Sequence, residues 1–270
     1  MNKGRSLILV CFCCILNTVY AQEEMVPKGY HLVFHDEFNR KNGSVPDTTK
    51  WQYTPHYWLA NGQWRRADKN QVYLEDGQLV CRALRNKDKI TSTDPDMLEG
   101  SVETRDKWNL TCGLIEVRMK TNPIPGNFTA AWLMPQPPAP QNPIGGEIDI
   151  VEIINEENVA YHTVHSYWTD VEGQRTYPRA NFQEEVQVAQ WHTYGVEWTT
   201  DSITWLLDGL PVGTYQRLEK EMIEDRGQWP YNKPFYIILT QSVGDGSWAT
   251  KPNLEMVYET RFDWVRVYQK

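Results

Sequence analysis

The sequence has few cysteines and no apolar run long enough to cross a bilayer as a helix. Only 5 of its 270 residues are cysteine, and no spacing of cysteine and histidine resembles a zinc site. Its apolar run from Leu7 to Leu16 has about half of the roughly 20 residues that a membrane-spanning helix requires. These absences argue against a zinc-stabilised fold, and we expect no transmembrane segment.

The short apolar run instead has the features of a secretory signal peptide. Lys3 and Arg5 precede it, and a Val19-Tyr20-Ala21 stretch follows it. A basic start, a short apolar segment and a small-residue cleavage site are the three parts of such a peptide. We therefore predict a signal peptide over residues 1–21, cleaved after Ala21, and export to the periplasm, the cell surface or the medium.

Cleavage at this point would leave Cys81 and Cys112 as the remaining cysteines. The three that are lost with the leader lack the preceding small residue that is usual at a lipoprotein site, so a lipid anchor is not favoured. Export permits a disulfide between the remaining two, but two buried thiols fit equally well. The sequence leaves this choice open.

Positive charge is also scarce, and no linker divides the chain. The formal charge is −8 with histidine neutral, and loss of the two cations Lys3 and Arg5 takes it to −10. An acidic protein repels polyanions at long range, which argues against a nucleic-acid partner and, less strongly, against heavily sulfated glycans. No Pro/Gly/Ser-rich linker interrupts residues 22–270, so we predict a single domain over this range.

Helical patterns are nearly absent, whereas strand patterns recur along the chain. Only Gln216–Asp225 looks helical, and the helix-length crossovers of a parallel barrel are missing. Turn signals such as Asp208-Gly209 separate short alternating or apolar runs, which indicates antiparallel strands. The predicted strands include residues 32–34, 71–74, 79–84, 114–119, 193–198, 212–215, 235–240 and 262–268. The sequence therefore predicts an all-β sandwich.

The densest group of carboxylates lies in Glu147-Ile148-Asp149-Ile150-Val151-Glu152. The three acids are separated only by β-branched residues, which favour a strand. Side chains alternate along a strand, so Glu147 and Asp149 share a face while Glu152 would point to the other. One extra residue between Asp149 and Glu152, a β-bulge, would turn Glu152 back, and bulges are common beside active sites. The alternative is a solvated strand edge, although surface strands rarely carry Ile and Val between all their charges.

A bulge would place the Cα atoms of the two glutamates roughly 13 Å apart, since strand residues rise about 3.3 Å each. Glutamates leaning toward each other would then come within about 5 Å, the separation of nucleophile and acid/base in retaining glycosidases. Asp149 between them would raise the cost of ionising both and keep one protonated as the acid. This arrangement predicts hydrolysis of a glycosidic bond with retention of anomeric configuration.

The six-residue motif resembles the Glu-x-Asp-x-x-Glu signature of glycoside hydrolase family 16, in the bulged form of its laminarinase, agarase and porphyranase branches. The likeness continues in His35-Asp36-Glu37-Phe38, in Gly113 to Arg118 and in Phe262 to Tyr268. It implies a jelly roll of two curved antiparallel sheets with an open cleft. It also implies that Glu147 is the nucleophile, Glu152 the acid/base and Asp149 a supporting carboxylate.

Aromatic residues concentrate where a sugar-binding cleft would need them. Trp58 and Trp64 lie in a ring-rich polar segment, and such segments stack on sugar faces, although part of it would equally fill the ends of the sandwich. The family resemblance implies Trp132 as a sugar platform, His165 near the acid/base and Trp248 as a further ring contact. A core position is the alternative for Trp132 and for His165.

The segment Tyr161–Trp168 follows the carboxylates and alternates as a strand does. Alternation places Tyr161, His165 and Tyr167 on one face and His162 on the other. An antiparallel strand beside the carboxylate strand would aim one of these two sets at the acids.

The resemblance also implies a structural calcium ion away from the chemistry. Glu37, the carbonyl of Gly77 and Asp263 match positions that often hold it in relatives, and calcium prefers oxygen ligands. No cofactor is expected to take part in catalysis.

The expected partner is a polysaccharide or the glycan of a glycoprotein, cut at internal bonds. Laminarinases usually carry Trp-Pro before Gly-Glu-Ile-Asp and Asn-Asn-Glu-x-Gln upstream, whereas this chain has Asn142-Pro143-Ile144 and Lys69-Asn70-Gln71-Val72. Residues 130–136, 145–147 and 162–165 look more like gut-bacterial members that act on galactose-containing chains.

Those members include O-glycanases that cut poly-N-acetyllactosamine in mucins at β-1,4-galactosyl bonds. We therefore expect an endo-β-galactosidase of this kind. The alternatives are a laminarinase-like endo-β-1,3(4)-glucanase and an algal galactan (agarose or porphyran) hydrolase. A non-catalytic carbohydrate-binding module on the same fold is disfavoured, because such modules tend to lose one or both glutamates and all three carboxylates stand here.

Overall fold

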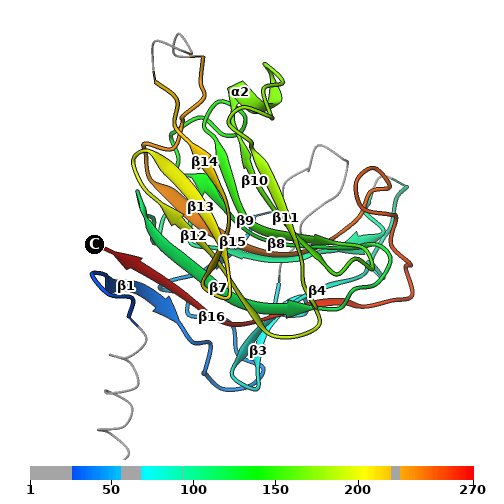
Figure 1. The fold of residues 1–270 in the computed structure, drawn as a ribbon. Coiled ribbons are helices and arrows are strands. Elements are labelled where there is room, and N and C mark those ends of the chain that lie inside the picture. Colours follow the sequence, from blue (N-terminus) through cyan, green and yellow to red (C-terminus); the bar gives the residue numbers. More distant parts are fainter. Residues whose placement is uncertain (1–25, 56–67, 93, 220–225) are drawn as a thin grey trace, which may run out of the picture.

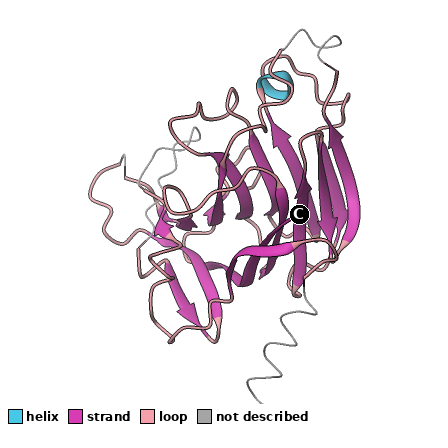
Figure 2. Ribbon diagram, turned by 90° about the vertical axis from the view of Figure 1, so that its left-hand side faces the viewer, coloured by secondary structure: helices cyan, strands magenta, loops and turns pink. Residues whose placement is uncertain are grey.

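Two packed antiparallel sheets make up nearly all the regular structure of the chain. The computed structural model describes residues 26–55, 68–92, 94–219 and 226–270. Figure 1 shows the two sheets curving together, and Figure 2 shows one short helix among the described residues, beyond the strand ends. The predicted all-β architecture of two curved sheets is confirmed.

The larger sheet has nine strands. Seven of them lie in the order β14 (Leu210–Gln216), β13 (Ser202–Leu207), β12 (His192–Trp198), β7 (Gly113–Thr121), β16 (Tyr258–Gln269), β4 (Gln78–Arg85) and β3 (Val72–Glu75). Of the remaining two, β1 (His31–Asp36) pairs with β16 and β5 (Met97–Leu98) pairs with β4.

The smaller sheet has seven strands and carries the acidic motif. Its order is β11 (Asn181–Glu185), β10 (Val159–His165), β9 (Glu147–Ile154), β8 (Asn127–Pro135), β15 (Phe235–Val243), β6 (Gly100–Glu103) and β2 (Gln52–Tyr53). The motif is the first part of β9, and β9 is flanked by partners on both sides.

The core lies between the two sheets and holds β9 in place. On β7, buried Ile115, Val117 and Met119 alternate with more exposed polar residues, as expected for a strand with one face in the core. From the facing sheet, Ile148 and Ile150 of β9 enter the same core and are fully buried. Burial of each such aliphatic side chain contributes about 1.5–3 kcal/mol, so β9 is anchored by its apolar face.

Two local predictions differ from the structure. The strand expected over Tyr161–Trp168 ends at His165, and Tyr167–Asp170 forms the short helix α2. The cause is Ser166, whose side chain accepts a hydrogen bond from the Thr169 amide while the Thr169 side chain accepts one from the Ser166 amide, a reciprocal cap that starts a helix. The prediction was therefore wrong for Ser166, Tyr167 and Trp168.

The helix predicted over Gln216–Asp225 is not found in the part that the structure describes. Gln216 is the last residue of β14, and residues 217–219 are irregular. Residues 220–225 lie outside the described part. The remaining predicted strands, from 32–34 to 262–268, all fall within observed strands apart from Gln71, which directly precedes β3.

The cysteine question that the sequence left open has an answer in the structure. Cys81 and Cys112 are both free thiols, the first fully buried and the second half-buried. The predicted signal peptide lies outside the described residues. Among those described, no helix has the length and apolar character needed to cross a membrane.

Candidate active site

The acidic strand contains the predicted bulge, which is seen in its pairing with both neighbouring strands. On one side, Asp149 pairs with Thr163 and Glu152 with Tyr161, so three steps along β9 match two along β10. On the other side, Asp149 pairs with Trp132 of β8 and Val151 pairs with Ala131. Two consecutive residues of β8 therefore match three of β9, and Ile150 is the extra residue. Two residues opposite one is the defining pattern of a β-bulge.

The bulge brings all three acids to one face of the sheet. Residues directly opposite in antiparallel strands share a face, and Glu147 pairs with His165, Asp149 with Thr163 and Glu152 with Tyr161. Those three partners alternate along β10, so they point to one side. Glu147 and Glu152 are half-buried, whereas Asp149 is only 2% exposed.

His165 connects the central aspartate to a second acid. Its Nε2 lies 3.3 Å from Oδ2 of Asp149, and its Nδ1 lies 2.9 Å from Oδ2 of Asp170 in α2. Arg175 forms an ion pair with the other oxygen of Asp170. Burial alone would lower the pKa of His165, but the hydrogen bonds to the two aspartates outweigh it and raise that pKa to about 11. The imidazole is therefore a cation at neutral pH.

Both glutamates hold their protons more tightly than exposed glutamates do. Burial, followed by the charge of Asp149, raises the pKa of Glu147 to about 8, while the charge of His165 opposes the rise. The same causes raise the pKa of Glu152 well above its ordinary value. The two carboxyls are therefore difficult to ionise together, so one of the pair keeps its proton when the other is charged.

Glycosyl hydrolases family 16 matches this chain over residues 60–266. That span is well over half of the sequence. The chain belongs to glycosyl hydrolases family 16.

Two curated relatives of this chain are named for different substrates. The chain is 30% identical over 244 residues to a keratan-sulfate endo-1,4-beta-galactosidase of Sphingobacterium multivorum. The matched region covers 89% of this chain and 55% of that protein. It is 29% identical over 266 residues to glucan endo-1,3-beta-glucosidase A1 of Niallia circulans, covering 90% and 38% respectively. The chain thus spans about half or less of the length of these curated relatives.

A solved structure supports both the fold and the family. It comes from work on endo-acting O-glycanases that members of the human gut microbiota express to initiate mucin breakdown. The identity is 28% and the TM-score is 0.72, over 88% of this chain and 98% of that one. The family 16 jelly roll expected from the motif is therefore confirmed.

The predicted sugar-binding residues have different outcomes within this family 16 fold. Trp132 pairs with Asp149, so it lies on the acidic face; it is half-buried, and its Nε1 donates a hydrogen bond to Oγ1 of Thr240 at 3.1 Å. His165 is on the same face, but its strand partner is Glu147, at the opposite end of the motif from Glu152, beside which it was expected. Trp58 and Trp64 lie outside the described residues.

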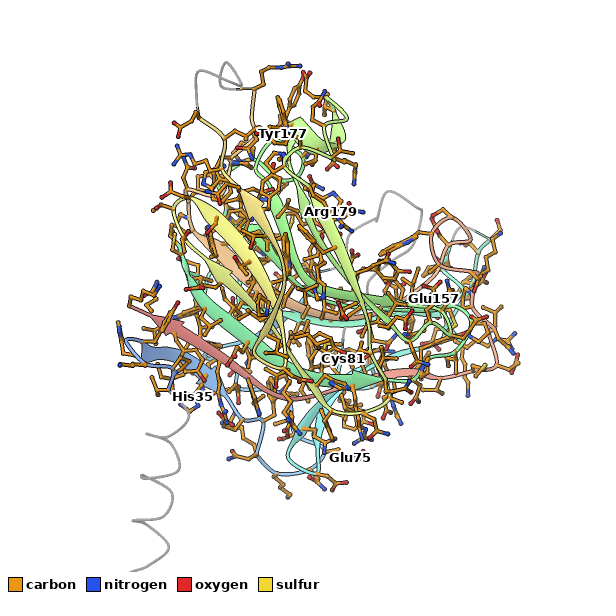
Figure 3. The ribbon with its side chains drawn as sticks, in the orientation of Figure 1. His35, Glu75, Cys81, Glu157, Tyr177 and Arg179 are labelled. Carbon is orange, nitrogen blue, oxygen red and sulfur yellow. The ribbon has the colours of Figure 1, made fainter. Side chains whose placement is uncertain are left out.

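Trp248 is 43% exposed and stands in the loop between β15 and β16. Its ring packs edge-on against Tyr161 at 5.4 Å and against Phe128 at 5.6 Å, measured between ring centroids. Tyr161 is the strand partner of Glu152, so this group of rings lies on the acid/base side of the site. Figure 3 shows Glu157, which accepts a hydrogen bond from Tyr161, at this end, and Tyr177 and Arg179 at the other end, near α2.

Of the residues proposed for a structural calcium, Asp263 is on β16, Glu37 follows β1, and Gly77 lies between β3 and β4. Asp36 pairs with Val265 and Leu79 with Phe262, which brings Glu37, Gly77 and Asp263 toward the same region. Both carboxylates already face guanidinium groups: Glu37 accepts two hydrogen bonds from Arg266, and Asp263 lies 3.0 Å from Arg118. This pairing does not favour calcium, and the ion stays a prediction.

Another group of possible cation ligands coincides with the acids themselves. Donor atoms of Glu147, Asp149 and His165 lie within 4.8 Å of one another. A histidine that ligates a metal must be unprotonated at the ligating nitrogen, whereas both nitrogens of His165 face aspartates. The cluster is therefore better described as two acids beside an imidazolium, which Asp170 also holds, than as a metal centre.

Replacing His165 with glutamine is expected to move the acid limb of the kcat/KM profile to higher pH by about 1 unit, because an opposite charge this close lowers a carboxyl pKa by about 1–3 units. The His165 charge lowers the pKa of both glutamates, so its loss raises both. The acid limb follows the ionisation of Glu147. His192→Gln is the matched control, since His192 also pairs with an aspartate, Asp208, but on β12. An acid limb that stays in place would show that His165 is uncharged in the free enzyme.

Proposed function

We propose that this chain is an endo-acting, retaining β-glycoside hydrolase that cleaves internal β-1,4-galactosyl bonds in poly-N-acetyllactosamine chains of mucin-type O-glycans. The observation that carries the reaction type is the bulged strand, which presents Glu147 and Glu152 on one face with Asp149 between them. The similarity to a keratan-sulfate endo-1,4-beta-galactosidase supports the galactosyl linkage. Because this substrate lies outside the cell, we also propose export by the predicted signal peptide.

In the first step, Glu147 attacks the anomeric carbon while Glu152 protonates the leaving oxygen. The raised pKa of both glutamates suits a pair in which one arrives protonated and the other ionised. The family 16 motif gives Glu152 the role of the acid and Glu147 that of the nucleophile. In the second step, Glu152 accepts a proton from water, and the water releases the sugar from Glu147 with net retention.

Asp149 and His165 govern how much negative charge the site holds. Asp149 lies between the two glutamates and disfavours the ionisation of both. The imidazolium of His165, held by Asp149 and Asp170, offsets part of that effect. The balance permits one glutamate to be ionised while the other keeps its proton, which double displacement requires.

A glucan is the second candidate substrate. The chain is nearly as similar to glucan endo-1,3-beta-glucosidase A1 as it is to the galactosidase. Both substrate types place the scissile bond between the same two carboxylates, so the choice depends on contacts with neighbouring sugars. An agarose or porphyran hydrolase is the third candidate.

One experiment tests both the reaction and the substrate. The protein is incubated with mucin O-glycans, laminarin, lichenan and agarose, and the products are separated by chromatography. Poly-N-acetyllactosamine is expected to yield internal oligosaccharides, and proton NMR is expected to show the β-anomer of the new reducing end first. Cleavage of laminarin alone would replace the galactosyl assignment, and an α-anomer appearing first would overturn the retaining mechanism.

A further inference from the structure

The bulge in β9 leaves two consecutive carbonyl groups that side chains from the core bind. Nδ1 of His162 donates to the carbonyl of Ile150 at 2.6 Å, and Nε1 of Trp205 donates to the carbonyl of Asp149 at 2.8 Å. All of these groups are fully buried apart from Asp149, which is 2% exposed. Because Ile150 is the extra residue, both hydrogen bonds are made at the bulge itself.

The two donors come from different sheets. His162 belongs to β10, the neighbour of β9, with its side chain on the core face. Trp205 belongs to β13 of the facing sheet and crosses the core to reach β9. Their ring centroids lie 6.4 Å apart, so the two side chains form one buried unit beneath the bulge.

The position of a bulge decides which way each following side chain points. Shifting the register of a strand by one residue moves its side chains to the opposite face. If the extra residue of β9 lay after Glu152 instead of at Ile150, the carboxylate of Glu152 would point into the core. A carbonyl at a bulge lacks its regular ladder partner, and a buried carbonyl without a hydrogen bond is costly, so side-chain donors favour one bulge position over others.

We propose that His162 and Trp205 are positioning residues that fix the bulge at Ile150 and thereby aim Glu152 at the leaving oxygen. Neither touches substrate, because both lie in the core. The inference rests on the proposed function, since it concerns the orientation of Glu152 as the acid. Burial lowers the pKa of His162 to about 4, so the ring is neutral, with its one N–H given to Ile150.

The proposed positioning role can be distinguished from an effect on protein stability, because positioning acts only through Glu152. A poor leaving group needs protonation, whereas dinitrophenolate departs without it, so in the first step, which kcat/KM reports, a misplaced acid slows only the first kind of substrate. The ratio of the two rates does not depend on how much of the variant is folded. It therefore reports the position of Glu152 and not the loss of stability that follows from changing a buried residue.

The test measures kcat/KM on poly-N-acetyllactosamine and on the 2,4-dinitrophenyl glycoside of GlcNAc-β-1,3-galactose, with laminarin and its dinitrophenyl laminaribioside in parallel. His162→Leu and Trp205→Phe each remove one donor. For His162→Leu, the ratio of glycan rate to aryl rate is expected to fall by about 100-fold, because misplacement of a catalytic group by about 1 Å costs about that factor. For Trp205→Phe, the ratio is expected to fall by less. His162→Asn places an amide N–H near the original donor and is expected to restore the ratio.

Trp198→Phe is the matched control. Trp198 is also buried, and its Nε1 donates to a backbone carbonyl, that of Tyr231, at 3.1 Å, but not at the bulge. Its ratio is expected to stay at the wild-type value. If His162→Leu slowed both substrates equally, or Trp198→Phe lowered the ratio as much, the positioning role would be overturned while the proposed function stood. A wild type that cleaved none of the four substrates would refute the proposed function and this inference with it.

Discussion

Glu147→Ala is expected to abolish hydrolysis, with kcat falling by about 10⁴- to 10⁶-fold, the range seen when a nucleophile is removed. The side chain lies at the start of β9, opposite the imidazolium of His165, and no other carboxylate occupies its position along the strand. Added azide is expected to enter the space left by the carboxylate and attack the anomeric carbon. One displacement instead of two gives a glycosyl azide of inverted configuration.

The measurement is kcat on the cleaved glycan, followed by NMR of the azide product. Glu184→Ala is the control, because Glu184 is an exposed glutamate on β11 outside the acidic motif, and it is expected to keep full activity. Substantial hydrolysis by Glu147→Ala without azide would mean that another group is the nucleophile.

Glu152→Ala is expected to show a different pattern, which identifies it as the acid/base. On a natural glycan, kcat should fall by about 10²- to 10⁴-fold, the usual contribution of a general acid. On a dinitrophenyl glycoside the glycosyl-enzyme should still form quickly, because that leaving group needs no proton. Hydrolysis of the intermediate then lacks its base, so azide is expected to accelerate turnover and give a product of retained configuration.

Steady-state and burst kinetics on the aryl glycoside, with NMR of the azide product, check this expectation. The two alanine variants serve as controls for each other, since one azide product is inverted and the other retained. An inverted product from Glu152→Ala would exchange the two roles. An equal loss in the rate of glycosyl-enzyme formation from glycan and aryl substrates would show that Glu152 acts on something other than the leaving group.

The bulge was predictable because the residues permit few other arrangements. A strand over Glu147–Ile154 follows from its β-branched residues, and strict alternation would have buried the carboxylate of Glu152 among apolar side chains. Burying an unpaired carboxyl there is costly, so one extra residue was the simplest solution. The sequence alone did not indicate which residue would be extra, since that depends on partners in β8 and β10.

The surroundings of His165 were less predictable, for a physical reason. Asp170 comes back to His165 only because the chain turns into α2 after Ser166. The strand alternation of the preceding residues gave no signal of that turn. Contacts such as Trp248 with Phe128 join residues far apart in the sequence, and their partners depend on how the strands of the sheet are ordered.

Because Ile150 is an extra residue in the pairing of β9, the motif tolerates a change of length at this one position. Two steps along β10, from Thr163 to Tyr161, span three along β9, from Asp149 to Glu152. A version lacking Ile150 would pass through the same two pairs in regular alternation, with both terminal acids unchanged in orientation. Deletion of one residue elsewhere in a strand reverses all that follows. Deletion of Ile150 would therefore shorten the motif to five residues in one step, with the rest of the sheet left intact.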